Sequence, residues 1–474
     1  MIGQLKLNTY WLLLSQGLSI IAALILSLIL ARHLGPVYNG EYGFASSIVS
    51  IFAVFVDFGI SVITIRDLAR DLTQTKKYID NIMLLKIIIG IILLFMIFIT
   101  SIFLKNKFSG ITLLMLFLGT YNILSGGFNP FLRGIFRSYS KMKYESITII
   151  SEKIILIILG VIALFYYKSI VLYSLSLTIS AAAGMAVTIY IIRKRFTNFF
   201  YEIDWKFWKY ILKEIWPFGL SSIMITIYFS IDQTIIGILK PIIDVGYFSL
   251  ARSTTAVVGS IIGILAGVLF PTFSSLYKSN IKELEKLIDN ALKFMVIIAM
   301  AFFTEMLLLS HNLVLLVFGY KYLPSVNPLI LLSCATTIIF INTLLGNVLS
   351  ATDKQKAFMP GLFISMIINI LVNLILIPRY GINGSAIASI FTEGFLTIYI
   401  YKLVNKEINV KIHKHLLKPL IASGVMAIII ILLHSVEVIA LSLIGIIVYF
   451  LALIIIKGIS IKFIKEEILT LKRV

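Results

Sequence analysis

The sequence predicts an all-α integral membrane protein with about fourteen transmembrane helices, and three observations support this prediction. Of the 474 residues, 59% are hydrophobic and 13% are charged, and the mean hydropathy is +1.03. A soluble domain carries about 25% charged residues. Apolar stretches of about 20 residues, long enough to cross a ~30 Å hydrocarbon core, recur along the whole chain. Basic residues concentrate in every second loop between these stretches, so the bilayer is the solvent for most of the surface.

Windows of high hydropathy predict fourteen spans, each bounded by polar or charged loops. The spans cover residues 9–31, 42–64, 81–104, 110–132, 146–167, 170–192, 214–239, 245–271, 291–318, 326–351, 358–378, 383–402, 416–434 and 438–457. The first apolar run is too long for a signal-peptide core and no small-residue cleavage site follows it. We therefore expect it to be a retained span.

The distribution of basic residues orients these spans. Of the 41 Lys and Arg residues, 31 fall in the two terminal segments and alternate loops or within three residues of them, 7 in the remaining loops and 3 deeper inside spans. Cytoplasmic loops carry the excess of Lys and Arg in membrane proteins. Both termini are therefore predicted in the cytoplasm, which requires an even number of spans, and the protein is predicted in the cytoplasmic (cell) membrane.

The sequence lacks the residues that several classes of function require. The net charge of +19 lies in short loops without a folded basic patch, so we expect no nucleic-acid partner. Cys334 is the single cysteine and the five His are scattered, which argues against a metal site and against other cofactors. No Gly-x-x-x-x-Gly-Lys-Ser/Thr loop is present, so the chain carries no nucleotide-driven motor. No cluster of His, Asp and Glu lies in a long external loop, as a membrane-embedded saccharide polymerase or ligase would need. The chain is therefore predicted not to be an enzyme.

Two halves of the sequence resemble each other. Asn122 and Gly126 correspond to Asn342 and Gly346, residues 188–191 and 397–400 both read Thr-Ile-Tyr-Ile, and Tyr42 corresponds to Tyr247. Six spans separate the partners, so the halves share one orientation and form a parallel repeat. We predict a six-helix N-terminal lobe at 1–200, a six-helix C-terminal lobe at 201–410, and two further helices with a cytoplasmic tail at 411–474. Such lobes enclose a cavity for alternating access.

Short motifs in the right order give the chain a family resemblance. They are Leu30-Ala-Arg-His-Leu-Gly-Pro36, Gly40-Glu-Tyr-Gly43, Asp57-Phe-Gly59, Ile65-Arg-Asp-Leu-Ala-Arg70, Asn129-Pro130, Met142-Lys-Tyr144, Val245-Gly-Tyr247, Leu250-Ala-Arg252, Leu269-Phe-Pro271 and Pro378-Arg-Tyr-Gly-Ile-Asn-Gly384. Together they resemble the polysaccharide (O-antigen, Wzx-type) flippase family. That family belongs to the multidrug/oligosaccharidyl-lipid/polysaccharide (MOP) exporter superfamily.

The resemblance implies a function. The cargo would be a polyprenyl-diphosphate-linked oligosaccharide, flipped from the cytoplasmic to the outer leaflet for surface polysaccharide synthesis. Membrane lipids, polysaccharide polymerases and glycosyltransferases would be the partners. A lipid II flippase and a drug/cation antiporter of the same superfamily stay open as alternatives, and so does the saccharide polymerase or ligase. A cation antiporter favours an acidic cavity, whereas the basic residue Arg252 in the second lobe favours an anionic cargo.

Ionisable groups inside a bilayer are costly, so each is a functional candidate. Arg252, in span eight, is the leading candidate for binding the diphosphate, because its planar guanidinium matches phosphate oxygens. Gly259, Gly263 and Gly267 on the same span are expected to form a ridge for close helix packing. The alternative is that Arg252 extends to the outer interface.

Four further basic residues are candidates for substrate binding. Arg32 and Arg66 end spans one and two, where each lines the cavity or anchors the span at the interface. Lys86 and Lys153 lie inside spans three and five, where each is a cavity charge or pairs with another helix. Glu152 precedes Lys153, but sequence neighbours on a helix are not expected to face each other.

The acidic candidates are Asp57, Asp232 and Glu393, with Glu305 as a fourth intramembrane carboxylate. Burial in low dielectric favours the protonated form of a carboxylate, which could then exchange a proton or Na⁺ as a coupling ion. A structural salt bridge or polar packing is the alternative for each residue. The sequence leaves H⁺ and Na⁺ equally open.

Overall fold

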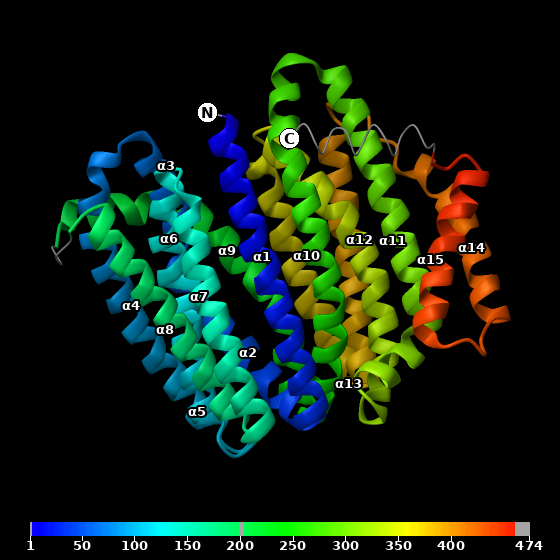
Figure 1. Cartoon of the computed structure of the whole chain (residues 1–474), viewed down its shortest axis with the longest axis horizontal. Coiled ribbons are helices and arrows are strands. Elements are labelled where there is room, and N and C mark those ends of the chain that lie inside the picture. The colour runs from blue at the N-terminus through cyan, green and yellow to red at the C-terminus, as the bar shows by residue number, and fades with distance from the viewer. Residues whose placement is uncertain (1, 199–202, 460–474) are drawn as a thin grey trace. The chain divides into compact units, whose positions relative to one another are not determined.

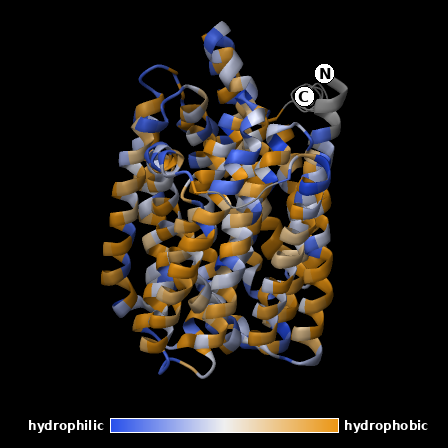
Figure 2. Ribbon diagram, turned by 90° about the vertical axis from the view of Figure 1, so that its left-hand side faces the viewer, coloured by the Kyte–Doolittle hydropathy of each residue, from blue (hydrophilic) through white to orange (hydrophobic). Residues whose placement is uncertain are grey.

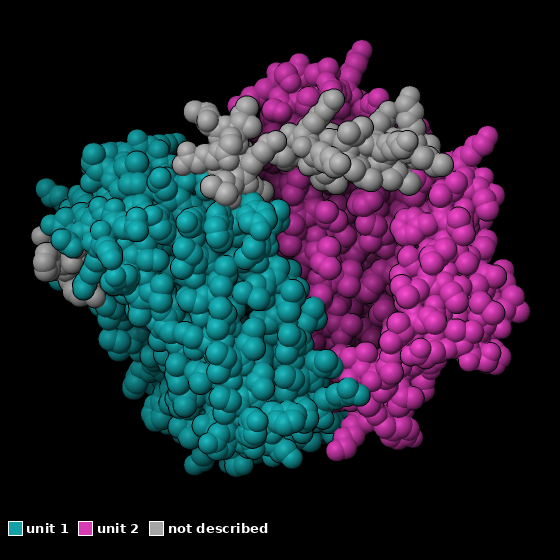
Figure 3. Space-filling model, viewed as in Figure 1, with its two compact units in different colours: residues 1–249 teal, residues 250–474 magenta. Residues whose placement is uncertain are grey.

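The computed structural model describes residues 2–198 and 203–459, and all regular secondary structure in these ranges is helical (Figure 1). The chain divides into two compact units, Met1–Ser249 and Leu250–Val474 (Figure 3). The lobe boundary predicted between residues 200 and 201 stays a prediction. Of the cytoplasmic tail predicted after residue 457, residues 460–474 lie outside the described residues.

The described residues of the first unit form nine α-helices and four shorter π- or 3₁₀-helical segments. They are α1 (Ile2–Ile29), η1 (Leu30–Leu34), α2 (Pro36–Asp57), α3 (Ile60–Arg70), η2 (Leu72–Gln74), α4 (Thr75–Phe103), α5 (Ile111–Asn122), η3 (Ile123–Phe128), α6 (Asn129–Ser138), α7 (Met142–Val161), η4 (Ile162–Tyr166), α8 (Ile170–Arg195) and α9 (Trp205–Leu239). Helix α2 is central, because it packs against α4, α5 and α9. On the other flank α7 packs against α1 and α8.

The second unit contains most of α10 and the remaining helices. They are α10 (Ile242–Ser279), α11 (Ile281–Val317), η5 (Tyr320–Ser325), α12 (Val326–Ala351), α13 (Gln355–Val404), η6 (Ile412–His415), α14 (Leu417–Leu432) and α15 (Val438–Ile455). Helix α12 packs against both α11 and α13. Helices α14 and α15 pair with each other beside α11, as expected for two additional C-terminal spans (Figure 1).

The number of membrane-length helices agrees with the prediction. Within the described ranges, thirteen helices are long and apolar enough to cross a membrane. Helix α13 has 50 residues and a length of about 75 Å, more than twice a hydrocarbon core. Its backbone breaks at Gly381, where φ is 58° and ψ is −139°, shortly after Pro378. The break falls between predicted spans 358–378 and 383–402, so α13 is two spans and the total of about fourteen is confirmed. Hydrophobic residues cover the helix flanks, and hydrophilic residues gather near helix ends (Figure 2).

The beginnings of α2 and α10, both in the first unit, cross in backbone contact. A Cβ on Gly40 would lie 2.0 Å from the Ile242 carbonyl oxygen, and a Cβ on Gly246 would lie 1.8 Å from that of Pro36. Asn39 Nδ2 donates to the Gly246 carbonyl at 3.1 Å. The contact is reciprocal, because Gly40 meets Ile242 and Gly246 meets Pro36. The same 206 positions separate Pro36 from Ile242 and Gly40 from Gly246. The two helix starts therefore repeat each other in structure with a spacing of 206, one position from the 205 that separates Tyr42 from Tyr247.

Contacts between loops agree with the predicted alternation of sides. In the first unit, Asn81 accepts from the backbone of Asp204 at 2.7 Å, and Asn8 donates to the Ser140 carbonyl at 2.9 Å. All four residues lie in or beside segments predicted as cytoplasmic. Lys107, predicted on the outer side, donates to the Ile238 carbonyl at the end of α9.

The second unit shows the same pattern at one end. Lys354 pairs with Glu407, and the Lys354 ammonium holds the pKa of this carboxyl below its usual range. His415 lies 2.8 Å from Asp289. The backbone of residue 409 donates to Glu285 at 2.9 Å. These contacts join segments that the basic residues predict on one side, although which side is cytoplasmic stays a prediction.

Candidate functional site

A break between α2 and α3 positions the best-defined charged group of the first unit. Helix α2 ends at Asp57, and the next two residues, Phe58 and Gly59, adopt left-handed backbone conformations, with φ of 41° and 83°. Gly219 of α9 makes room for this break, because a Cβ there would lie 2.3 Å from the Phe58 ring. The Asp57-Phe-Gly59 motif thus ends the helix and leaves its last carbonyl groups open to other donors.

Lys86 of α4 fills this position. Its Nζ donates to the carbonyl oxygens of Val56 at 3.1 Å and Gly127 at 2.9 Å, and to Asp57 Oδ1 at 2.8 Å. An ammonium has three protons, and these three acceptors use all of them. The Lys86 side chain is 0% exposed, whereas the Asp57 side chain is 25% exposed. Lys86 is therefore a buried counter-ion at the end of α2, and of the two side chains only that of Asp57 is partly exposed.

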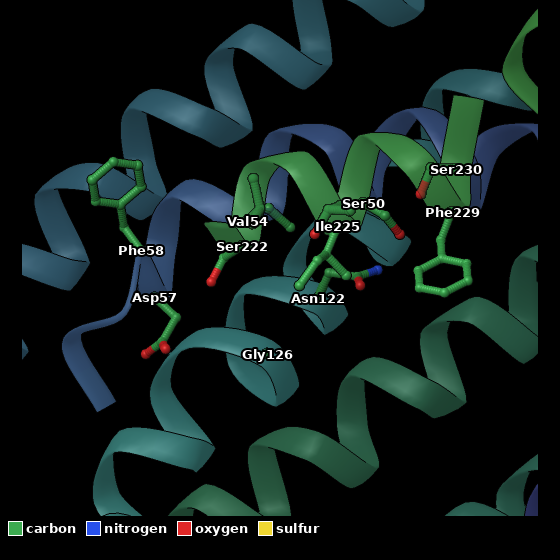
Figure 4. A pocket seen from close by; sticks show the side chains of 12 residues that line it. Ser50, Val54, Asp57, Phe58, Asn122, Gly126, Ser222, Ile225, Phe229 and Ser230 are labelled. Carbon is green, nitrogen blue, oxygen red and sulfur yellow. The ribbon is translucent and has the colours of Figure 1, made fainter. Parts of the chain in front are cut away.

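Asp57 lies at one end of a cavity of about 400 Å³ within the first unit (Figure 4). One face of α2, one face of α9, and the junction of α5 with η3 line it. Its polar lining residues are Ser50, Asp57, Asn122, Ser222, Thr226 and Ser230. Phe229 lies at the opposite end from Asp57, while the Phe58 ring turns away from the Asp57 carboxylate (Figure 4).

A second buried network joins α6, α7 and α8. Arg133 Nη2 lies 2.6 Å from Glu152 Oε2, and Lys153 Nζ lies 2.8 Å from Glu152 Oε1. Asn129 donates to Glu152 and to the Ala181 carbonyl. The expectation that Glu152 and Lys153 do not meet is wrong here, because the long lysine side chain curls back to the carboxylate. Glu152 is 2% exposed and Lys153 is 17% exposed, so the pair is largely internal.

The remaining basic candidates occupy more open positions. Arg66 of α3 pairs with Asp67 at 2.7 Å and with Glu214 of α9 at 3.0 Å, and its side chain is 35% exposed. Arg32 is exposed in η1. Arg252 is half-buried in α10. Their assignment to substrate stays a prediction.

The glycine ridge beside Arg252 does not have the predicted packing. A Cβ built on Gly259, Gly263 or Gly267 meets no described atom within 4 Å. The expectation of close helix packing at these residues is wrong, because this stripe of α10 faces open space. The neighbouring face, with Ile262, Ala266 and Phe273, packs into the core of the second unit instead.

Two of the acidic candidates, Asp232 and Glu393, are buried in spans. Asp232 of α9 is 1% exposed and Glu393 of α13 is 4% exposed. Glu393 accepts from Asn342 Nδ2 at 2.7 Å, and Thr397 donates to Asn342 Oδ1 at 2.7 Å. Glu305 of α11 accepts from Ser442 of α15. Coupling roles for Asp57, Asp232 and Glu393 stay predictions.

Comparison with known families decides what kind of protein this is. The profile of the family described as "Polysaccharide biosynthesis protein" matches residues 5–277, more than half of the chain. The chain belongs to this polysaccharide biosynthesis protein family. A second profile, "Lipid II flippase MurJ", matches residues 245–458. The predicted membership of the MOP superfamily is confirmed.

Two relatives are proteins of polysaccharide or glycan biosynthesis, and two solved structures share the fold. The chain is 23% identical over 408 residues to "Capsular polysaccharide biosynthesis protein CapF" of Staphylococcus aureus, covering 85% of this chain and 99% of the relative. It is 25% identical over 193 residues to "Probable low-salt glycan biosynthesis flippase Agl15" of Haloferax volcanii, covering 40% and 41%. Among solved structures, "Lipid II flippase MurJ, inward closed conformation" matches with a TM-score of 0.77 at 16% identity, over 95% of this chain and 98% of that one. A multidrug resistance MATE family transporter in the inward-facing conformation matches with a TM-score of 0.66 at 16% identity, over 82% and 95%.

Two features of this family member were missed from sequence. The predicted span 110–132 leaves Arg133 in the following loop, but α6 continues to Ser138 and the Arg133 side chain is only 12% exposed. The hydroxyl-lined cavity was missed because Ser50, Thr226 and Ser230 give no charge signal. Thr226 and Ser230 lie four residues apart on α9 and so share one helical face, which is the pattern that could have indicated a polar wall.

Proposed function

We propose that this protein flips a polyprenyl-diphosphate-linked oligosaccharide from the cytoplasmic to the outer leaflet of the cell membrane, as a step in surface polysaccharide synthesis. The family match over residues 5–277 carries this proposal. The name of the Haloferax relative, a probable glycan biosynthesis flippase, supports the same activity. The fold shared with a lipid II flippase supports movement of a whole lipid-linked molecule within the bilayer.

Charged groups inside the spans support transport of a charged, hydrophilic headgroup. Arg252 of α10 is our candidate for the diphosphate, with Arg32, Arg66 and Lys153 as further candidates. Lys86 has its three protons used inside the protein and is the counter-ion of Asp57 instead. Asp232 and Glu393 are the candidates for coupling to H⁺ or Na⁺, and Asp57 is a candidate for coupling to H⁺. Since the chain has no nucleotide-binding loop, an ion gradient or the membrane potential would supply the energy. Moving one charge through 100 mV is worth ~2.3 kcal/mol.

Lipid II is the second candidate cargo. The match of the lipid II flippase profile to residues 245–458 favours it. The two cargoes are distinguished by the glycan that disappears from the cell surface. Loss of a peptidoglycan precursor at the outer leaflet indicates lipid II, and loss of surface polysaccharide indicates the oligosaccharide.

The cellular test is deletion of the gene in its own host. We expect surface polysaccharide to disappear while its complete lipid-linked oligosaccharide accumulates at the cytoplasmic leaflet. A polymerase or ligase would give a different result, because single repeat units or unattached glycan would still reach the outer leaflet. Accumulation of the lipid-linked unit on the outer leaflet in the deletion strain would therefore contradict a flippase.

A further inference from the structure

The cavity in the first unit has a polar wall contributed by three separate helices. Ser50 and Asp57 lie seven residues apart on one face of α2, and Thr226 and Ser230 lie on one face of α9. Seven residues of α-helix span about 10 Å. Asn122 ends α5 and lines the wall between them. At about 400 Å³, the cavity is within the range of small-molecule sites, about 300–1,000 Å³.

Several hydrogen-bonding groups of this wall have no partner among the described residues. Serine and threonine in a helix commonly donate to the carbonyl four residues earlier, as Ser222 does to Phe218 at 3.0 Å. Among the described residues, the hydroxyls of Ser50, Thr226 and Ser230 make no such bond and have no other protein partner. Three neighbouring hydroxyls are therefore left to whatever fills the cavity.

The carboxylate and the amide have spare capacity as well. Asp57 Oδ1 accepts from Lys86 and Ser61, and Oδ2 accepts from none of the described residues. Asn122 donates to the Leu118 carbonyl at 2.9 Å, while its Oδ1 has no donor in the described part of the chain. The wall thus offers both acceptors and rotatable hydroxyls. A ligand that donates and accepts at several points would satisfy it.

The charge of the cavity excludes an anion. Its one charged lining residue is Asp57, and the Lys86 ammonium below it is 0% exposed and fully used by three acceptors. A diphosphate would meet a carboxylate oxygen and no exposed cation, so nothing in the cavity would compensate for the hydration that its charges lose. An organic cation would gain little, because Lys86 already balances Asp57. A metal ion needs several oxygen ligands at about 2.0–2.6 Å, and a wide cavity with one carboxylate does not supply them.

A neutral sugar residue fits the cavity better than an anion, an organic cation or a metal ion does. Its hydroxyl groups donate and accept, which matches the wall, and its ring carbons are apolar enough to pack on Phe229 at the end opposite Asp57 (Figure 4). We infer that this cavity is a subsite for one neutral sugar of the lipid-linked oligosaccharide, separate from the group that holds the diphosphate. This inference rests on the proposed function, since the sugar arrives as part of the flipped lipid.

The first experiment measures protection of the cavity by two probe lipids. Cys334, the single cysteine, is replaced by Cys334→Ala, and Thr226→Cys is introduced into the wall. Alkylation by a small maleimide is followed with the host's polyprenyl-diphosphate-linked oligosaccharide, with bare polyprenyl diphosphate, or with neither. The sugar-linked lipid should slow alkylation about tenfold, and the bare lipid should not. Ser279→Cys, exposed at the end of α10, is the labelling control and should be unaffected by either lipid.

The second experiment measures the preference of the transporter in proteoliposomes. The triple variant Ser50→Ala, Thr226→Val and Ser230→Ala should reduce the flipping of the sugar-linked lipid, relative to the bare lipid, by about tenfold or more, because each lost hydrogen bond typically contributes severalfold. Ser221→Ala is the matched control. Ser221 neighbours the wall on α9 but donates to the Pro217 carbonyl and does not line the cavity.

The outcomes separate the subsite from the proposed function. If the wild-type protein flips the sugar-linked lipid but Thr226→Cys is equally reactive with and without it, the subsite is overturned and the flippase stands. Equal protection by bare polyprenyl diphosphate also overturns the subsite, because the cavity would then take the diphosphate or the lipid chain. If the wild-type protein flips neither lipid, the proposed function fails, and the subsite fails with it. The single cysteine variant keeps the test decisive if the triple variant does not fold.

Discussion

The crossing of α2 and α10 gives a prediction that can be worked out from the coordinates. In Gly246→Ala the new Cβ would lie 1.8 Å from the Pro36 carbonyl oxygen and 2.8 Å from its carbon. A carbon and a carbonyl oxygen normally approach to about 3.3–3.6 Å, so the helices must separate by about 1.5 Å. Both groups in contact belong to the backbone, and no side chain can rotate to relieve the overlap.

The expected loss of stability is about 3 kcal/mol. Overpacking of this kind costs about 1–3 kcal/mol, and a displacement of this size lies at the upper end. Separation also breaks the bond from Asn39 to the Gly246 carbonyl, which adds about 1 kcal/mol. The higher helix propensity of alanine offsets about 1 kcal/mol of this loss of stability. Gly40→Ala should cost a similar amount, since its Cβ would lie 2.0 Å from the Ile242 carbonyl oxygen.

The assay is thermal unfolding of the purified variants in one detergent. Gly263→Ala, on the same helix with no described atom within 4 Å of its Cβ, is the control and should stabilise by about 0.5–1 kcal/mol. The double variant Gly40→Ala with Gly246→Ala should cost clearly less than the sum of the singles, because one separation of the helices relieves both overlaps. Wild-type stability in Gly246→Ala, or strict additivity in the double variant, would refute the reciprocal crossing.

Three further predictions follow from the charged groups and the topology. Lys86→Met should destabilise the protein by about 3–5 kcal/mol in the same thermal assay, because Asp57 and two carbonyl groups lose their buried donor. Adding Asp57→Asn to this variant should recover part of the lost stability. A Lys86→Met variant as stable as the wild type would contradict the buried pair. Arg252→Ala should abolish surface polysaccharide export while the protein remains folded in the membrane. Arg252→Lys should restore export only in part, since the ammonium is a point charge and the guanidinium is a planar group with several donors. Full export by the alanine variant would remove Arg252 from the mechanism. Reporter fusions after residue 193 and after residue 474 should both give a cytoplasmic signal, and an external signal from either would overturn the predicted orientation.

The sequence predicted the spans well because the bilayer imposes a simple rule on composition. Even the 50-residue helix α13 was divided correctly, since Pro378 and Gly381 interrupt an apolar run that is too long for one crossing. Loop pairing such as that of Lys354 with Glu407 agrees with the alternation of basic residues. These features depend on local chemistry, which a single sequence contains.

Features that depend on helix rotation and register could not be predicted. Lys86 and Asp57 lie 29 positions apart on two helices, and nothing in the sequence says that their faces meet. The π-helical turns at η1, η3 and η4 change hydrogen-bond register without changing hydropathy. Close glycine packing was expected along Gly259, Gly263 and Gly267, but the structure places it at Gly40 and Gly246. Small residues permit close approach, but only the tertiary structure determines which of them have a partner.

The most direct test of the central claim is movement of the lipid itself. The purified protein is reconstituted into liposomes with a labelled polyprenyl-diphosphate-linked oligosaccharide, and the fraction in the outer leaflet is followed after addition of a membrane-impermeant reagent. Proton, Na⁺ and potential gradients are imposed separately, without nucleotide, and Arg252→Ala serves as the matched control. We predict fast transfer by the wild-type protein, dependence on at least one gradient, and loss of transfer in the variant. Transfer no faster than in protein-free liposomes under every gradient would contradict the proposal that this protein is a flippase for lipid-linked saccharides.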